Sequence, residues 1–119
     1  TGFLRKVFEI FEVNNTPIDM ITTSEVGVSV SIDNKANLGR IVDELKKYGS
    51  VTVDEDMCII CVAGDLDWSN VGFETLVTDA MANIPVRMIS YGGSNYNISF
   101  LIREADKKQA LQNLSAKLF

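Results

Sequence analysis

Two hydrophobic periods follow one another in the first part of the chain. Apolar residues first recur at helical spacing, which predicts an amphipathic helix: Phe3, Leu4, Val7, Phe8 and Phe11. This helix must end before Pro17, because the residue ahead of a proline is held in an extended conformation. From residue 26 to residue 33, apolar and polar residues alternate, as in a strand with one buried face. A second helical pattern then runs from Leu38 to Leu45.

The same order of patterns returns in the second half of the chain. Residues 15–22 and 83–90 share the motif N-x-P-[IV]-x-M-I-[ST], and each copy follows a helical pattern that opens with Gly-Phe, at Gly2 and at Gly72. A strand pattern and a closing helical pattern come after the second motif, as they do after the first: Ile98, Phe100 and Ile102, then Leu111, Leu114 and Leu118. Matches in the same order indicate an internal repeat.

The segment between the two copies supplies two further predicted strands. Val51 and Val53 follow the second helix of the first copy, and the apolar run 57–63 precedes the first helix of the second copy. With these strands included, the repeat unit reads β-α-β-β-α-β, the ferredoxin-like pattern of an α+β fold. We therefore expect two ferredoxin-like units, residues 1–55 and residues 56–119.

Each predicted unit lacks one strand of this pattern. The first unit begins at its helix with no opening strand, and the second ends at Phe119 with no closing strand. Because Thr1 is not an initiator methionine, we expect a longer chain whose preceding sequence supplies the missing strands, or a partner subunit that does so. Either source would cover a sheet edge, which folded proteins rarely leave bare.

Composition narrows the possible functions. The chain of 119 residues is 46% hydrophobic, which supports a folded core. Its 16 acidic residues outnumber its 11 basic residues, and the resulting net charge of −5 argues against a nucleic-acid partner. No apolar run approaches the roughly 20 residues that a membrane helix needs. A cytoplasmic protein that binds no membrane is therefore expected.

Few residues are candidates for catalysis or metal binding. Cys58 and Cys61 form a C-x-x-C, but they lie in the apolar run 57–63, which has the pattern of a fully buried strand. Side chains alternate along a strand, so the two thiols would point to opposite faces. We expect two buried structural thiols. The sequence has no histidine, the commonest general base and metal ligand. No catalytic residue, metal or cofactor is predicted.

Several segments carry a more specific signal. G-F-L at residues 2–4 is followed by V-F at 7–8, and D-M-I-T-T-S-E-V occupies residues 19–26. In the second copy, R-M-I-S-Y-G-G-S at residues 87–94 leads to N-I-S-F-L at 97–101. Together these segments resemble the paired ACT domains of lysine-sensitive aspartokinases. The resemblance implies a regulatory region that dimerises through its ACT units, senses an amino acid and follows an N-terminal kinase domain. The region itself would carry no catalytic machinery.

The residues indicate how an amino acid such as L-lysine could be bound. Gly2, Phe3 and Leu4 stand at a helix start, where unpaired N–H groups and the helix dipole favour a carboxylate. Asp19 and Glu25 could each accept an ammonium group in a charge-assisted hydrogen bond. Lysine has two ammonium groups, whereas threonine and methionine would leave one acid unmatched. This pairing favours lysine as the effector.

The resemblance adds Ser24 to the effector contacts and places the pocket at an interface between ACT units. The sequence departs from the pattern of lysine-sensitive relatives at Pro17, where those proteins can carry a serine. One side-chain hydrogen bond at the effector site would be lost. The repeat provides an internal control, since the second copy has Arg87 where the first has Asp19. We therefore predict one effector site per chain, in the first unit, with the second unit serving packing and dimerisation.

Two other functions remain open at this point. A ligand-free ACT dimerisation domain with a decayed pocket would self-associate without binding lysine. A small enzyme on a ferredoxin-like fold would need an acid, a base or an oxyanion-stabilising group, and the sequence displays no such constellation without histidine. The amino-acid sensor accounts for more of the sequence than either of these.

Overall fold

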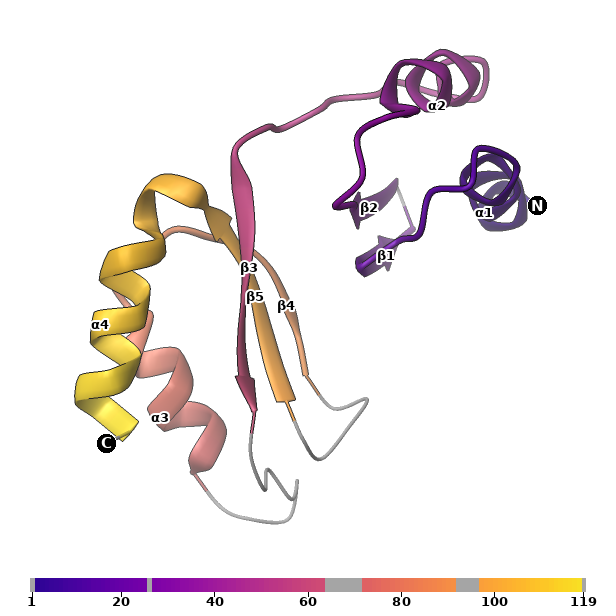
Figure 1. Cartoon of the computed structure of the whole chain (residues 1–119). Coiled ribbons are helices and arrows are strands. Elements are labelled where there is room, and N and C mark those ends of the chain that lie inside the picture. Colours follow the sequence, from indigo (N-terminus) through magenta and orange to yellow (C-terminus); the bar gives the residue numbers. More distant parts are fainter. Residues whose placement is uncertain (1, 26, 64–71, 92–96, 119) are drawn as a thin grey trace. The chain divides into compact units, whose positions relative to one another are not determined.

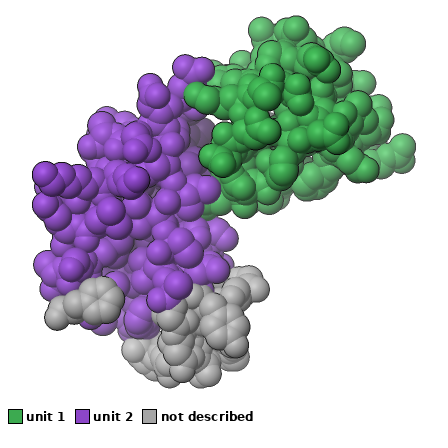
Figure 2. Space-filling model, viewed as in Figure 1, with its two compact units in different colours: residues 1–53 green, residues 54–119 purple. Residues whose placement is uncertain are grey.

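The computed structural model describes residues 2–25, 27–63, 72–91 and 97–118. The chain divides into two compact units, residues 1–53 and residues 54–119, which Figure 2 shows in different colours. Each unit has its own hydrophobic core. No helix in the described ranges is long and apolar enough to cross a membrane.

Unit 1 consists of two helices and a two-stranded antiparallel sheet (Figure 1). Its elements follow in the order α1 (Phe3–Val13), β1 (Met20–Ser24), β2 (Gly27–Ser31) and α2 (Leu38–Leu45). The two strands pair with Ile21 opposite Val30. Apolar side chains from both helices and from one face of the sheet form the core: Val7, Ile10, Phe11 and Ile41, with Ile18, Val30, Ile32 and Leu45 packed against them. The amphipathic periodicity of each helix is thus explained by one shared core.

Polar contacts fix the loop that joins α1 to β1. The buried Asn14 donates from Nδ2 to the carbonyl of Ile10 at 2.8 Å. The carbonyl of Asn14 accepts two hydrogen bonds, one from Thr16 Oγ1 at 3.0 Å and one from Asn37 Nδ2 at 2.7 Å. Asn37 precedes α2, so these bonds join the end of α1 to the start of α2. Buried polar groups are costly without partners, and here they are paired.

Unit 2 contains a three-stranded antiparallel sheet with two helices on one face (Figure 1). Its elements are β3 (Met57–Ala63), α3 (Phe73–Ala80), β4 (Val86–Ser90), β5 (Asn97–Arg103), the short 3₁₀ helix η1 (Glu104–Asp106) and α4 (Lys107–Leu118). The strand order β3-β5-β4 places the last strand between the first two. The largest fully buried side chains of this unit come from β5 and α3: Ile98, Phe100, Ile102 and Val77.

The observed elements confirm the predicted α+β class and the ferredoxin-like order of helices and strands. One predicted strand is wrong: the segment with Val51 and Val53 is extended chain that belongs to no sheet. Alternating valines favour strand geometry, but a strand also needs a neighbour for its backbone N–H and C=O groups. Within the described part of the chain, no strand pairs with this segment.

The prediction that β3 is fully buried is also wrong. Ile60 lies in the core, and Cys58 and Val62 pack against it, whereas Ile59 keeps 38% of its surface exposed and Cys61 is exposed. The reason is that α3 and α4 cover only one face of the sheet (Figure 1). The two thiols do point to opposite faces, as alternation requires, but only Cys58 is partly buried.

We predict that the two thiols differ in reactivity. Burial, and secondarily the charge of Glu104, raises the pKa of the Cys58 thiol, so less of the reactive thiolate is present at pH 8. Cys61 is exposed and should be alkylated first by iodoacetamide. Peptide mass spectrometry over a time course would measure both rates, with urea-unfolded protein as the control in which the two rates converge. Equal rates in the folded protein would contradict the prediction.

The two helices that open the repeats begin in the same way. Gly2 has φ 79° and Gly72 has φ 86°, both in the left-handed region, and neither α1 nor α3 has a side-chain cap. A Cβ built on either glycine would meet no heavy atom within 4 Å. Glycine is therefore needed at these positions because it can adopt the left-handed backbone conformation. It is not needed to avoid a clash with a side chain.

We expect Gly2→Ala and Gly72→Ala each to lower the free energy of unfolding by about 1 kcal/mol, because an alanine is strained in the left-handed region. Urea denaturation would measure the loss. Gly39 is the matched control: it lies inside α2 without a positive φ, so Gly39→Ala should stabilise the protein, by up to about 1 kcal/mol. A Gly2→Ala variant as stable as the parent would show that this residue is not held in the left-handed region.

Candidate functional site

The start of α1 offers the predicted seat for a carboxylate. Gly2, Phe3 and Leu4 are all exposed, and the N–H groups of a first helical turn have no partners within the helix. The left-handed Gly2 turns the chain into the helix, and its carbonyl accepts the first helical hydrogen bond, from the N–H of Lys6 at 3.0 Å. The space above Gly2 is open, so a small anion could approach the backbone there.

Asp19 lies at the entrance of β1, where two hydrogen bonds to Ser31 hold the chain. The Asp19 N–H donates to the Ser31 carbonyl at 2.9 Å, and the Met20 N–H donates to Ser31 Oγ at 3.0 Å. Ser31 is buried, so its hydroxyl anchors the first residue of β1 to the last residue of β2. The Asp19 side chain is exposed and forms no ion pair with any described residue. Its carboxylate is available to a cation.

Ser24 and Glu25 lie at the opposite end of β1. Ser24 is the last residue of the strand, opposite Gly27, and Glu25 follows in the exposed turn. At about 3.3 Å per residue, a strand separates Asp19 from Glu25 by roughly 20 Å. A lysine molecule is far shorter than this distance. One copy of the chain therefore does not bring the two predicted ammonium partners together.

The start of α1 lies at the same end of unit 1 as Ser24 and Glu25. α1 spans about 16 Å, at 1.5 Å per residue, and the strand that follows it has nearly the same length. The loop of residues 14–19 reverses the chain between them, and α1 shares its core with Val30 of β2, the strand that pairs with β1. Gly2, Phe3 and Leu4 thus share an end with Ser24 and Glu25, whereas Asp19 lies at the other end.

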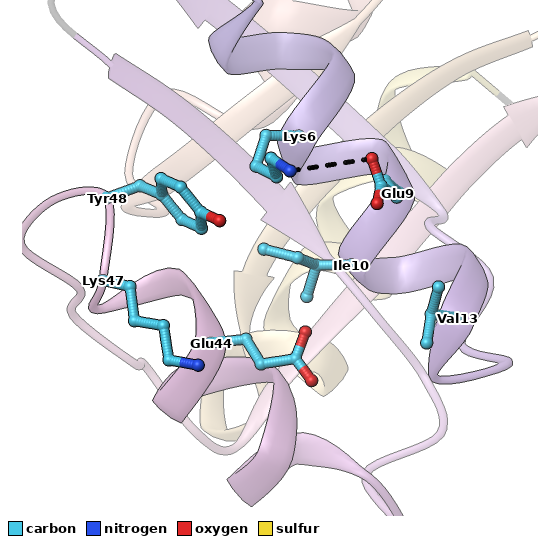
Figure 3. A pocket seen from close by; sticks show the side chains of 7 residues that line it. All are labelled: Lys6, Glu9, Ile10, Val13, Glu44, Lys47 and Tyr48. Carbon is cyan, nitrogen blue, oxygen red and sulfur yellow. Dashed lines mark ion pairs between the residues drawn. The ribbon is translucent and has the colours of Figure 1, made fainter.

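A shallow pocket occurs elsewhere in unit 1, between α1 and the end of α2 (Figure 3). Its volume is about 110 Å³, and it is lined by Lys6, Glu9, Ile10, Val13, Glu44, Lys47 and Tyr48. The ammonium of Lys6 lies 3.9 Å from the Glu9 carboxylate and 5.6 Å from the centre of the Tyr48 ring. The lining charges balance one another, and none of the predicted effector residues contributes.

The described residues contain no group of three or more histidine, cysteine, aspartate or glutamate side chains placed to hold a metal ion. Val26 and residues 92–94, which belong to the segments that resemble ACT domains, lie outside the described residues.

Some residues of the predicted apolar helical patterns lie on the surface, among them Phe8 and Leu111. Phe8 fits the helical core pattern, yet 46% of its surface is exposed. The signal that could have identified it is the repeat itself, because the equivalent residue of the second copy is the polar Thr78.

Comparison with known proteins places the chain in a family. The ACT-domain family model matches residues 60–118. A solved structure from Porphyromonas gingivalis W83, described as a C-terminal regulatory domain of aspartate kinase, is 57% identical, with a TM-score of 0.90 over 99% of this chain and 81% of that one. Escherichia coli aspartokinase III, solved in complex with lysine and aspartate, is 35% identical, with a TM-score of 0.85 over 99% of this chain and 28% of that one.

A curated relative agrees with these structures. Chloroplastic aspartokinase 1 of Arabidopsis thaliana is 34% identical over 99% of this chain, which spans only 22% of that protein's length. The P. gingivalis protein matches along most of its own length, so the likeness concerns the regulatory region as a whole. The chain therefore belongs to the family of C-terminal regulatory regions of aspartate kinases, which are built from ACT domains.

Proposed function

We propose that this chain is an allosteric sensor of L-lysine that restrains the kinase activity of a longer aspartate kinase. The lysine-bound E. coli aspartokinase III supports this effector, because its regulatory region resembles the chain over nearly its whole length. In the proposed protein an N-terminal kinase domain phosphorylates aspartate in the cytoplasm, and the ACT region supplies no catalytic group or cofactor. Lysine would act as the feedback signal of the pathway that begins with that phosphorylation.

The chemistry of unit 1 fits a lysine molecule. The first turn of α1, at Gly2, Phe3 and Leu4, receives the carboxylate. The exposed carboxylates of Asp19 and Glu25 receive the two ammonium groups, with Ser24 as a neighbouring contact. Threonine and methionine have one ammonium group each, so either would leave a carboxylate unpaired.

The length of β1 is the observation that supports a site shared between two copies. Asp19 and Glu25 stand at opposite ends of a strand that runs from Met20 to Ser24, roughly 20 Å apart. Both acids can contact one lysine only when Asp19 comes from one copy and Glu25 from the other. We therefore propose a homodimer in which the effector lies at the interface between two first ACT units, residues 1–55 of each chain.

The second unit, which the sequence predicts to span residues 56–119, is proposed to serve packing. Arg87 occupies the place that Asp19 has in the first copy, and its Nε lies 3.7 Å from a carboxylate oxygen of Asp54. A guanidinium at this position would repel an ammonium group instead of binding it. One effector site per chain follows from this difference.

Lysine can inhibit the kinase only by binding one arrangement of the protein more tightly than another. A ligand held between two copies meets this requirement, because it binds one relative placement of those copies and not the others. The relative placement that lysine selects would then favour the inactive state of the kinase domain attached to each copy.

Calorimetry on the chain with its natural preceding sequence tests the choice of effector. We expect heat of binding with lysine, and none with threonine or methionine at the same concentration. Binding of threonine or methionine without binding of lysine would refute the lysine assignment. Self-association without binding of any of the three would instead support a ligand-free dimerisation domain.

Mixing two variants tests whether the site is shared. Asp19→Asn and Glu25→Gln should each weaken lysine binding about tenfold or more, because each removes a charge-assisted hydrogen bond. In a mixture of the two variants, random pairing into dimers should rebuild roughly a quarter of the sites, each with Asp19 from one copy and Glu25 from the other. Calorimetry would count the recovered high-affinity sites.

Arg87→Ala is the matched control from the second unit and should leave lysine affinity unchanged. A mixture that binds no better than its two components would show that the acids do not act across an interface between copies.

A further inference from the structure

The two helices of each unit contact one another, so the repeat allows their facing side chains to be compared. The helices that open the units align on Gly2 and Gly72. The helices that close them align on the residues that they contribute to the two cores: Ile41 with Ala110, and Leu45 with Leu114. The equivalent residues between the helices are then Glu9 and Asp79, Val13 and Asn83, Glu44 and Asn113, and Tyr48 and Lys117.

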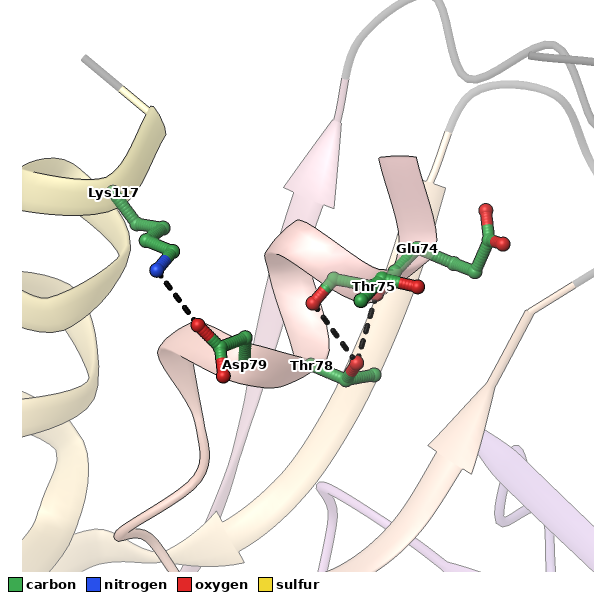
Figure 4. A network of polar contacts seen from close by, with 5 residues as sticks. All are labelled: Glu74, Thr75, Thr78, Asp79 and Lys117. Atoms are coloured by element: carbon green, nitrogen blue, oxygen red, sulfur yellow. Dashed lines mark hydrogen bonds and ion pairs between the residues drawn. The ribbon is translucent and has the colours of Figure 1, made fainter. Parts of the chain in front are cut away.

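In unit 2, side chains join the two helices directly. The Asp79 carboxylate of α3 forms an ion pair with the Lys117 ammonium of α4 at 2.6 Å (Figure 4). Further along, Nδ2 of Asn113 in α4 donates to Oδ1 of Asn83, just after α3, at 2.8 Å. The two contacts link α3 to α4 above the core of the unit.

Unit 1 has residues at the same positions that cannot form these contacts. Val13 has no polar atom to offer to Glu44, and Tyr48 brings no positive charge to Glu9. The pocket of about 110 Å³ lies at this place (Figure 3). It therefore results from the side chains of unit 1, because the same arrangement of helices is bridged in unit 2.

The pocket lining combines both charges with apolar surface. Glu44 is half-buried and forms no ion pair with a described residue. The Lys6 ammonium lies 3.9 Å from the Glu9 carboxylate, which is too far for a hydrogen bond, so it can donate to another acceptor. Ile10 and Val13 add apolar surface to the same pocket. These groups are complementary to the ammonium, carboxylate and side chain of a small aliphatic α-amino acid.

We propose that the pocket between α1 and α2 binds a small aliphatic α-amino acid. Its ammonium group contacts Glu44, its carboxylate contacts Lys6, and its side chain packs against Ile10 and Val13. The bound molecule links α1 to α2, as the side chains of unit 2 link α3 to α4. None of the residues of the proposed lysine site lines this pocket, so the inference goes beyond the proposed function.

Saturation-transfer NMR with L-valine tests the site on the chain with its natural preceding sequence. We expect transfer that is strongest for the valine methyl groups, because these would contact Ile10 and Val13. Glu44→Gln and Lys6→Met should each raise the dissociation constant for valine about tenfold or more, because each removes a charge-assisted hydrogen bond. Valinamide and N-acetylvaline, which each lack one of the two charges, should bind the parent as weakly as valine binds these variants.

Two further variants use the repeat. Val13→Asn introduces the residue that unit 2 has at this position, and its amide can donate to Glu44 in competition with the ligand. Valine affinity should fall about threefold or more. Lys117→Met is the matched control for Lys6→Met, because it removes a lysine from between the helices of the other unit, and it should leave valine affinity unchanged. Circular dichroism would check that each variant is folded.

The proposed lysine site can be separated from this one. Asp19→Asn should weaken lysine binding and leave valine affinity unchanged, whereas Glu44→Gln should do the reverse. Absence of saturation transfer to valine, valine binding that ignores both Glu44→Gln and Lys6→Met, or valine binding lost with Asp19→Asn would overturn the inference. Valine binding with the expected variant effects supports it, whether or not the same protein binds lysine.

Discussion

Burial of one face of each sheet beneath two helices is the interaction on which the rest of the structure depends. In unit 2 this burial places Phe100 and Ile102 out of reach of water, and in unit 1 it does the same for Ile41. Apolar area removed from water is the main favourable term in folding, so these faces decide where every element lies. The other faces, edges and helix flanks are left free to differ between the two units.

The sequence predicted the helices and most strands because the spacing of hydrophobic residues that marks each element is a local property of the chain. It failed where the outcome depends on distant partners. The run 57–63 reads as fully buried, but its pattern cannot reveal that helices cover only one face of β3. Val51 and Val53 have strand propensity, but within the described residues no strand pairs with them. Phe8 continues an apolar stripe, and only Thr78 in the other copy marks its side of the helix as a surface.

For the candidate site, the sequence predicts a binding chemistry, but it does not reveal how far apart the residues lie. Residue types predict an anion seat at Gly2 and two cation partners at Asp19 and Glu25, and all three residues are exposed. Their arrangement depends on the length of β1, because each further strand residue moves the two acids about 3.3 Å apart. A short separation in sequence therefore became a long separation in space.

The length of β1 also has a thermodynamic consequence. If one lysine must contact acids from two copies, its binding and the association of the copies are linked equilibria. Lysine would then lower the dissociation constant of the dimer by the same factor by which dimerisation lowers the dissociation constant for lysine. The apparent sensitivity of the sensor would rise with the amount of protein present, so that enzyme abundance itself would help to set the lysine level at which inhibition begins.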